Sequence, residues 1–423
     1  MTDLLALSDR ILSGETAITD HHPFSPPNEL QEVGEGTAFL QSFANVSALR
    51  TGDGLVLVDT GSPFVAPLVH AKVREWDAGR LHTAVYTHGH IDHVFGTGPF
   101  EEEAAANGWP DVQVVAHEDI EARFDRYCAC SGYNAVINQR QFQAPGLTWP
   151  TEYRRPDVTY RDRLDLDVGG LGLELHHARG ETDDATWVWV PERRTVCTGD
   201  LIIWCTPNAG NPQKVQRYAR EWAVALRTMA ALAPELLLPG HGLPVRGEDQ
   251  VRAVLEDTAT VLEVLHDRTL ALMNEGARLD DIVHEVRAPE DLLAKPYLRP
   301  IYDDPEFVVR GVWRLYGGWY DGDPSHLKPA PAADLAGELA TLAGGAAALA
   351  ARAQELAAAG DDGSLRLAGH LAELAVQAAP EDPGLHRARA EVFRTRAAAE
   401  PALMAKGVFT WAANESDARA DPS

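Results

Sequence analysis

Cysteine, basic residues and long apolar runs are all scarce in this sequence of 423 residues. Four cysteines are too few for a disulfide scaffold in a chain of this length. Cys128 and Cys130 are one residue closer than the Cys-x-x-Cys spacing of zinc and redox sites, so both are expected to be plain thiols. No stretch of about 18 apolar residues occurs, and the first residues lack the basic segment and apolar core of a signal peptide. We therefore expect a cytoplasmic protein with no membrane partner.

The shortage of basic residues also limits the partners of the chain. There are 37 Lys and Arg against 63 Asp and Glu, and the formal net charge is -26 at pH 7. Nucleic-acid binding depends on many Lys or Arg contacts with phosphate, so a nucleic-acid partner is not expected. An anionic small substrate would meet a repulsive overall field, and its binding would need a local positive feature such as a bound metal.

Two types of sequence pattern divide the chain, as its length predicts for more than one domain. From about residue 38 to 260, short β-like runs alternate with helical stretches, which is typical of a layered α/β domain with ligands at its strand ends. The runs span 54–62, 83–88, 112–117 and 171–178, with a hairpin at 186–200.

Beyond about residue 247 the apolar residues recur at helical intervals, and the first helix is expected to stop at Gly276. A Pro- and aromatic-rich stretch at 295–331 follows, and then Ala-rich helices are predicted at 332–359, 363–379, 383–398 and 401–413. These helices are compatible with tetratricopeptide-style hairpins or with a plain bundle, which would cap the α/β domain or pair subunits.

The densest group of candidate ligands lies in the segment YTHGHIDHVFG at 86–96. His88, His90, Asp92 and His93 occupy six positions directly after a predicted buried strand. Imidazole nitrogen and carboxylate oxygen are ligands that Zn²⁺ takes at about 2.0 to 2.2 Å. Four such groups exceed what one tetrahedral metal accepts from a single loop, so the segment predicts two adjacent metals.

The segment THGHIDH resembles the H-x-H-x-D-H signature of the metallo-β-lactamase superfamily, and supporting elements follow in the order of that family. VLVDTGS resembles the strand whose aspartate, here Asp59, supports the metal loop. CTGD is similar to the strand end that provides the bridging acid, Asp200, and LLLPGHG to the one that provides the last ligand, His241.

One element differs from the commonest pattern of the superfamily. Most members carry a histidine in a PGHT turn, whereas ARGETDDA at 178–185 leaves Glu181 in that place. This carboxylate is similar to what the alkylsulfatase (type III sulfatase) branch uses. A plain capping or surface acid at Glu181, with His176 or His177 supplying a nitrogen instead, remains the alternative.

The alkylsulfatase resemblance extends to VWRLYGGWYDGDPSHLKP at 312–329, which is similar to the start of the dimerisation region of those enzymes. It implies an α/β metallo-β-lactamase αββα sandwich followed by an all-α helical domain, without the sterol-carrier-like domain of longer members. The expected divisions are a catalytic domain at 1–250, a helical dimerisation domain at 251–415 and a disordered tail at 416–423. A homodimer is therefore expected, with an intrachain cap over the site as the alternative.

The resemblance also implies a ligand set and a reaction. It assigns two Zn²⁺ per chain, a catalytic role for Asp92, and hydrolysis of an alkyl sulfate ester by a metal-bound hydroxide. Cleavage of another bond, such as a phosphoester, carboxylic ester, lactone or thioester, and an idle metal-binding scaffold remain alternatives. Metal one would be held by His88, His90 and Glu181, metal two by Asp92, His93 and His241, and Asp200 would bridge them.

Substrate contacts are expected from aromatic residues and from polar residues near the site. The positions after the bridging acid where alkylsulfatases carry His and Arg are Thr206, Pro207 and Asn211, and Lys214 or Arg217 would have to reach the site from a shifted loop. The candidate lining of an apolar cavity is Phe39, Phe43, Tyr133, Phe142, Trp149 and Trp204. The assigned substrate-binding residues are Tyr133, Asn134, Arg140, Trp204 and Asn211.

Overall fold

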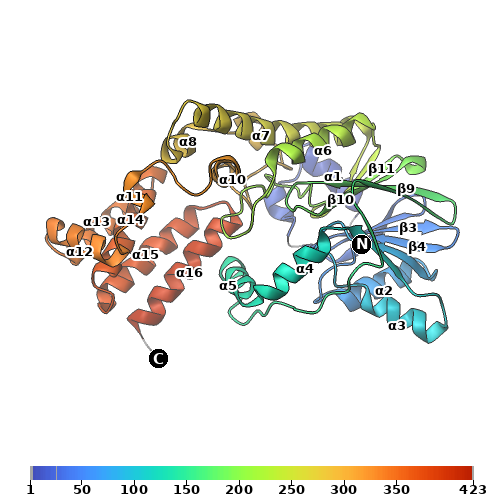
Figure 1. The fold of residues 1–423 in the computed structure, drawn as a ribbon, viewed down its shortest axis with the longest axis horizontal. Helices are drawn as coiled ribbons and strands as arrows, with labels where there is room; N and C mark the ends of the chain where they lie inside the picture. Colours follow the sequence, from blue (N-terminus) through green and yellow to red (C-terminus); the bar gives the residue numbers. More distant parts are fainter. Residues whose placement is uncertain (1–2, 25, 422–423) are drawn as a thin grey trace.

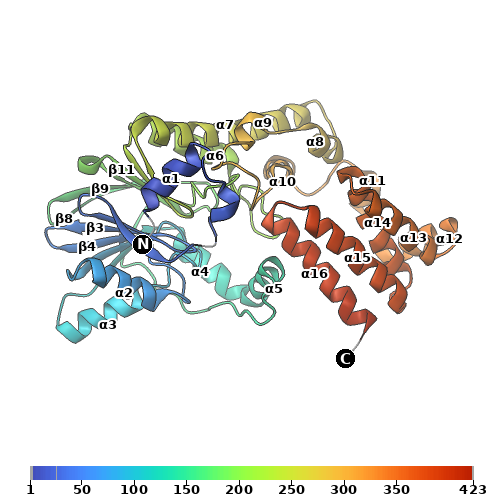
Figure 2. The ribbon, with the colours of Figure 1, turned by 180° about the vertical axis from the view of Figure 1, so that it is seen from behind.

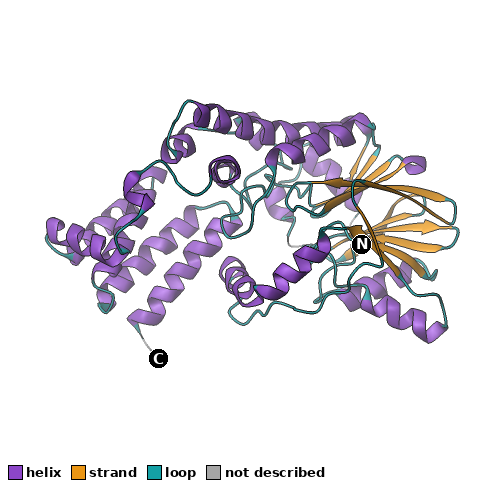
Figure 3. Ribbon diagram, viewed as in Figure 1, coloured by secondary structure: helices purple, strands orange, loops and turns teal. Residues whose placement is uncertain are grey.

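Two β-sheets packed face to face form the centre of the N-terminal half of the molecule (Figures 1 and 3). The computed structural model describes residues 3–24 and 26–421. The seven-stranded sheet has the order β1 (Glu29–Gly34), β2 (Thr37–Gln41), β3 (Val46–Thr51), β4 (Gly54–Val58), β5 (Leu81–Val85), β6 (Gln113–His117) and β7 (Val158–Tyr160). The six-stranded sheet has the order β13 (Val245–Arg246), β12 (Leu236–Pro239), β11 (Thr195–Gly199), β10 (Ala185–Val190), β9 (Leu171–Ala178) and β8 (Arg163–Val168).

Strand β4 shows how the sequence produces the layers. Successive side chains of a strand point to opposite faces of the sheet. Val56 and Val58 lie in the core shared with the second sheet, whereas Leu55 and Leu57 pack in a separate core with Val69 and other residues beneath the outer helices. Both faces of this strand are therefore covered, which explains its nearly continuous apolar run.

Helices cover the outer faces of both sheets, so the predicted αββα sandwich is confirmed. Helices α2 and α3 cover the first sheet, and α6 and α7 cover the second (Figure 1). The helices of this half are α1 (Leu4–Leu12), η1 (Ile18–His21), α2 (Ala66–Trp76), α3 (Gly98–Asn107), α4 (Ile120–Ala129), α5 (Ser131–Phe142), η2 (Pro191–Arg193) and α6 (Ala219–Ala231).

After β13 the described chain is entirely helical, as the sequence predicts (Figure 2). The predicted domain boundary at 250 falls in the first turn of α7. No helix among the described residues is both long and apolar enough to cross a bilayer. The helices are α7 (Glu248–Asn274), α8 (Leu279–Glu285), α9 (Glu290–Leu293), α10 (Pro305–Gly317), α11 (Pro324–Leu327), α12 (Ala332–Ala343), α13 (Ala346–Ala359), α14 (Asp362–Ala378), α15 (Pro383–Ala399) and α16 (Leu403–Ala420).

Two details of the helical half differ from the sequence predictions. The single helix predicted at 332–359 is divided because Gly344 and Gly345 have φ of +88° and +121°. The tail predicted to be disordered from 416 is helical to Ala420, because Ser416 and Ala420 are buried and Arg389 donates a hydrogen bond to the Ser416 hydroxyl at 2.6 Å. Residues 422–423 of that predicted tail lie outside the described part of the chain.

Helix α16 packs against α5 and connects the two halves of the molecule. The side chain of Gln143 donates a hydrogen bond to the carbonyl of Gly407 at 2.7 Å. A Cβ at Gly407 would collide with the backbone of Gln141, so the glycine permits this close approach. The C-terminal end of helix α5 is thus fixed by its contacts with α16 of the helical half.

Candidate metal centre

Four loops meet at one edge of the sandwich and carry the predicted metal ligands. Parallel pairing of β4 with β5 and of β11 with β12 brings the carboxyl ends of these strands to the same edge. Asp59 and the loop at 86–97 follow the first pair, and Asp200 and His241 follow the second. Glu181 enters from the turn between β9 and β10. Sequence-distant residues therefore converge because the strand order places their strand ends together.

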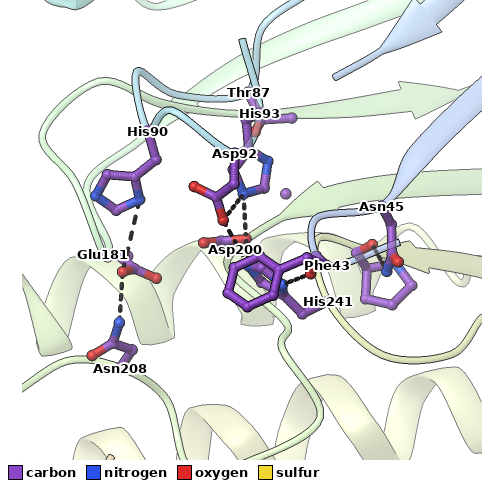
Figure 4. A network of polar contacts seen from close by, with 12 residues as sticks. Phe43, Asn45, Thr87, His90, Asp92, His93, Glu181, Asp200, Asn208 and His241 are labelled. Atoms are coloured by element: carbon purple, nitrogen blue, oxygen red, sulfur yellow. Dashed lines mark hydrogen bonds and ion pairs between the residues drawn. The ribbon is translucent and has the colours of Figure 1, made fainter. Parts of the chain in front are cut away.

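The seven predicted ligand side chains lie together. All of them except His88 are labelled in Figure 4. Asp200 is at the centre, with its Oδ1 3.2 Å from Nε2 of His93 and 3.3 Å from Nε2 of His241. Its Oδ2 is 3.5 Å from Nε2 of His88. The donor atoms fall within 4.8 Å of one another in three groups, which are His88, His93 and Asp200; Asp92, His93 and His241; and His90, Glu181 and Asp200.

The donor set fits a pair of divalent cations. Nε2 of His93 and Oδ1 of Asp200 are buried without a hydrogen-bond partner, although they face each other. Buried polar atoms are rarely left without partners, and a cation between these donors would satisfy both. Asp92, His93 and His241 form one group, as the predicted division has it, whereas His88 groups with His93 and Asp200 and not with His90 and Glu181. The role of these residues as ligands stays a prediction.

Hydrogen bonds behind the histidines direct their Nε2 atoms to the centre. Nδ1 of His93 is 2.7 Å from Oδ2 of Asp59, and Nδ1 of His241 contacts the carbonyl of Phe43. Asp59 also accepts the backbone N–H of Thr87 at 2.8 Å, which fixes the start of the metal loop. Such outer contacts typically orient metal-binding imidazoles and set their tautomer.

The carboxylates and imidazoles of the centre shift one another's pKa values in opposite directions. Burial lowers the pKa of His93, but the carboxylates of Asp200 and Asp59 outweigh burial and raise it well above the usual range. Burial and the neighbouring His93 lower the pKa of His88 to about 3. The pKa of Asp200 lies well below its usual range because His241 and His93 outweigh the effect of burial. A metal cation would take the place of an imidazole proton beside these carboxylates, because only a neutral imidazole nitrogen binds a metal.

Glu181 is buried, so the alternative of a surface acid is wrong. Its carboxylate pairs with Arg217 and accepts a hydrogen bond from Asn208 at 2.7 Å. Burial raises the pKa of Glu181 to about 7, while Arg217 acts in the opposite direction. A nearby metal cation would favour the ionised form, as expected of a ligand.

Neither histidine proposed as a substitute for Glu181 points into the centre. His176 stacks on Trp187 with a centroid distance of 4.1 Å. His177 donates from Nε2 to the carbonyl of Asp183 at 2.9 Å and stacks on His117 at 3.7 Å. His177 and His117 lie near Asp119, but their nearly parallel rings keep the in-plane lone pairs parallel, so they do not converge on one cation.

A cavity of about 330 Å³ opens beside the candidate metal centre. Phe43, Phe142 and Trp149 line it, as predicted, and so does Asn211. The apolar lining that the sequence analysis missed consists of Phe24, Phe64, Val65, Ile91, Leu147 and Ile203. The polar lining besides the metal-centre residues consists of Ser62, Asn138, Gln141, Asn208, Asn211, Lys214, Arg217 and Tyr302.

Three predicted aromatic contacts are wrong. Phe39 is on β2 in the core between the sheets, and Trp204 is fully buried with its indole donating to the carbonyl of Leu243 at 2.7 Å. Tyr133 is 61% exposed on α5 and does not line the cavity. The pattern of aromatic residues identified apolar positions but not the side of the element on which each would lie.

Asn134 and Arg140 do not line the cavity either. Asn134 shares a face of α5 with Asn138 but lies one turn earlier, and Arg140 lies on another face. The Asn134 side chain contacts the sulfur of Cys130 at 3.3 Å, and Arg140 donates to Gln213 at 3.0 Å. Asn138, one helical turn after Asn134, lines the cavity instead. The spacing of one helical turn between the two asparagines was the sequence signal that could have identified Asn138 as a cavity residue.

Two family models match the chain on either side of α7. Residues 41–241 match the model described as Metallo-beta-lactamase superfamily, and this range includes all seven predicted ligands. Residues 41–241 thus form a metallo-beta-lactamase superfamily domain. Residues 278–418 of the same chain match the model described as Alkyl sulfatase dimerisation.

Relatives of the chain occur in bacteria and yeast. The chain is 29% identical over 315 residues to a linear primary-alkylsulfatase of Pseudomonas sp., covering 69% of this chain and 59% of that protein. It is 23% identical over 321 residues to an alkyl/aryl-sulfatase of Saccharomyces cerevisiae, covering 69% and 49%. The chain therefore spans about half to three fifths of the length of these relatives.

A solved structure extends the likeness of fold to almost the whole chain. The stereoselective inverting sec-alkylsulfatase of Pseudomonas sp. superposes with a TM-score of 0.79 at 24% identity. The match covers 94% of this chain and 66% of that one. The sandwich and the helical half thus have the same arrangement in both proteins.

Proposed function

We propose that the chain is a dinuclear zinc hydrolase that cleaves an alkyl sulfate ester or a related ester. The observation that carries the proposal is the convergence of seven donor side chains beside an apolar cavity that also contains an unpaired lysine. The alkylsulfatase names of the relatives support the sulfate ester as the first substrate to test.

The chain's own residues divide into holding and orienting roles. His88, His90 and Glu181 would hold one metal, Asp92, His93 and His241 the other, and Asp200 both. When bound, zinc would polarise the ester and lower the pKa of a water toward about 7. Asp92 is the most exposed of the seven proposed ligands, at 20%, and lines the cavity, so it is the residue proposed as catalytic.

Lys214 is proposed to bind the anionic head group. The charge of the neighbouring Arg217 is already compensated by Glu181. Lys214 contacts only the Asn138 side-chain oxygen at 3.4 Å and the face of Trp149 at 5.3 Å. No described carboxylate pairs with it, so an anion in the cavity would be its natural partner.

Replacing Lys214 by methionine is expected to raise KM for an alkyl sulfate about tenfold, since a charge-assisted hydrogen bond contributes about 1.5 kcal/mol. Burial and Arg217 lower the pKa of Lys214 to about 8, so the lysine is charged below that pH and neutral above it. KM of the parent protein should therefore rise as pH passes 8, and this rise should be absent in Lys214→Met. Steady-state kinetics from pH 6 to 10 measure this rise in KM. If Lys214→Met raised KM for a neutral ester by the same factor, the assignment of Lys214 to the anionic head group would be wrong.

The apolar lining of the cavity suits a substrate with an alkyl group better than one with a polar group. Phe24 stacks on Tyr302 at 4.3 Å and Phe43 packs edge-on against His241 at 5.5 Å. These rings form an apolar wall of the cavity beside the candidate metal centre. Burying each methylene of an alkyl chain there would contribute about 0.8 kcal/mol.

A different ester is the second candidate, because the loop after Asp200 lacks the expected His and Arg. Thr206 donates its hydroxyl to the carbonyl of Leu298 at 2.7 Å and is turned away from the cavity. With Lys214 as a single point charge, the site lacks the bidentate fork that sulfate recognition by arginine would provide. A phosphoester, carboxylic ester, lactone or thioester therefore belongs in the same screen.

The proposal is tested by metal analysis and an ester screen. We expect two zinc ions per chain, loss of the rate with chelator, and sulfate release from an alkyl sulfate faster than nitrophenol release from phosphate and acyl esters. Faster turnover of another ester would replace the substrate but keep the hydrolase. The proposal that the protein is a hydrolase would be wrong if the chain took up no metal, or if it took up metal but cleaved none of these esters.

Homodimerisation is proposed through the helical half. Trp319 is 72% exposed and Leu342 is 83% exposed, and six of the fourteen large exposed apolar side chains of the described residues lie between 316 and 342. Sedimentation at micromolar concentration is expected to give about twice 46.0 kDa. Trp319→Glu is expected to shift the equilibrium to monomer, whereas Leu232→Glu, directly after α6, should leave it unchanged. A monomeric parent protein would instead favour a purely intrachain role for these helices.

A further inference from the structure

A buried arginine behind the candidate metal centre is not explained by the cavity or by the ligand set. Arg123 lies on α4 and is only 2% exposed. Its Nε is 2.6 Å from Oδ1 of Asp184, and its Nη2 pairs with Asp183. Its remaining nitrogen donates to the hydroxyl of Tyr127 at 3.2 Å. An arginine is rarely buried to this degree unless its partners require a fixed position.

Asp184 connects this arginine to the loop of the metal-binding motif. Its Oδ2 accepts the backbone N–H of Gly89 at 2.9 Å, and Gly89 stands between His88 and His90. The carboxylate of Asp184 is fully buried, and burial and Arg123 act on its pKa in opposite directions, with a net lowering. Arg123 and the loop amide thus both favour the ionised form of this buried carboxylate.

Arg123 also touches the loop directly. A Cβ at Gly89 would lie 2.8 Å from Cδ of Arg123, so the arginine stem packs against the loop backbone. Asp183 and Asp184 follow Glu181 by two and three residues, in the turn between β9 and β10. The arginine thus contacts both loops that carry the proposed ligands of metal one, the turn of Asp183 and Asp184 through its guanidinium and the loop of Gly89 through its stem.

We propose that Arg123 is a positioning residue that fixes the loop of His88 and His90 at a set separation from the loop of Glu181. This inference depends on the metal ligands of the proposed function. The separation of the loops sets how far Glu181 lies from the two imidazoles, and hence the affinity and geometry of metal one. Contacts behind metal ligands typically change metal affinity or activity by about 10 to 100-fold.

The experiment compares Arg123→Met with Arg126→Met in the full chain loaded with Co²⁺. Arg126 lies on the same helix, 36% exposed and 3.9 Å from Asp183, so it is the matched control. Arg123→Met is expected to weaken one of the two cobalt sites by about 10 to 100-fold and to change its visible absorption. Arg126→Met is expected to change neither. Equilibrium dialysis and the d–d spectrum measure both.

Two further variants keep the test decisive if Arg123→Met does not fold. Asp184→Asn retains an acceptor for Gly89 but removes the charge, and Arg123→Lys retains the charge but loses the fork. Both are expected to lower the affinity of one cobalt only. Parent-like affinity and spectrum in the variants that fold would overturn the inference, even with a lower melting temperature. A parent protein that binds fewer than two cobalt ions would instead overturn the proposed centre itself.

Discussion

Asp200→Ala is expected to lower the hydrolytic rate by about three orders of magnitude, which corresponds to about 4 kcal/mol of lost transition-state stabilisation. Asp200 is the one carboxylate within 3.5 Å of three candidate ligands, which are His88, His93 and His241. Without it, two metals would lose their shared ligand and the imidazoles would lose the charge that aligns them. Steady-state rates and metal content per chain measure the effect.

A matched control for Asp200 is a carboxylate outside the centre. Asp165 on β8 is 68% exposed and pairs with Arg163 at the surface. Asp165→Ala should leave rate and metal content unchanged, because exposed ion pairs contribute little. The assignment of Asp200 fails if its alanine variant keeps two metals and more than a tenth of the rate. Asp200→Asn preserves the shape of the side chain but removes its charge. Its rate and metal content should be close to those of Asp200→Ala, because the metals require the charge.

The ligand loops could be predicted from the sequence because their determinants are local. Four candidate ligands lie in six consecutive residues after one strand, and no distant contact is needed to place them together. Asp59, Asp200 and His241 were predicted from the resemblance of their segments to the superfamily, and in the structure each follows a short apolar strand whose parallel partner ends at the same edge. The alternation of strands and helices predicted a layered α/β domain, and the resemblance implied the αββα order of its layers.

The cavity could not be predicted in the same way because its wall comes from elements that the sequence does not relate. Asn138 is on α5, Lys214 is in an irregular segment before α6, and Tyr302 is in the helical half. Their proximity results from the packing of α16 against α5 and from the path of the loop after Asp200. Aromatic character predicted burial of Trp204, but only tertiary structure decides between core and cavity.

Helix ends in the C-terminal half illustrate the same limit. Gly344 and Gly345 were visible as a pair, but a run of alanines on both sides favoured one long helix. The structure ends α12 there because the two residues adopt positive φ, and α13 then packs against α14 and α15. The extension of α16 to Ala420 depends on contacts with α15, which a polar sequence at 414–421 does not reveal.

Gly240→Ala is expected to lower the rate by about 100-fold without altering any ligand. Gly240 precedes His241, and a Cβ at this position would collide with Oδ1 of Asp200 and lie 2.6 Å from the backbone carbon of Gly199. The backbone is fixed at this position by two hydrogen bonds of 2.8 Å. The Gly240 N–H donates to the carbonyl of Gly199, and the Gly240 carbonyl accepts from the N–H of Asn45. Misplacing reacting groups by about 1 Å costs about 100-fold.

The control for Gly240 is Gly98→Ala in the first turn of α3, where a Cβ would meet no atom within 4 Å. That variant is expected to keep its rate and to gain a little stability, because alanine restricts the unfolded chain. Gly240→Ala should also lose stability by about 1 to 3 kcal/mol, as overpacked sites do. A lower melting temperature with an unchanged rate and two metals would mean that Asp200 moves freely. The central position of this carboxylate would then not determine catalysis.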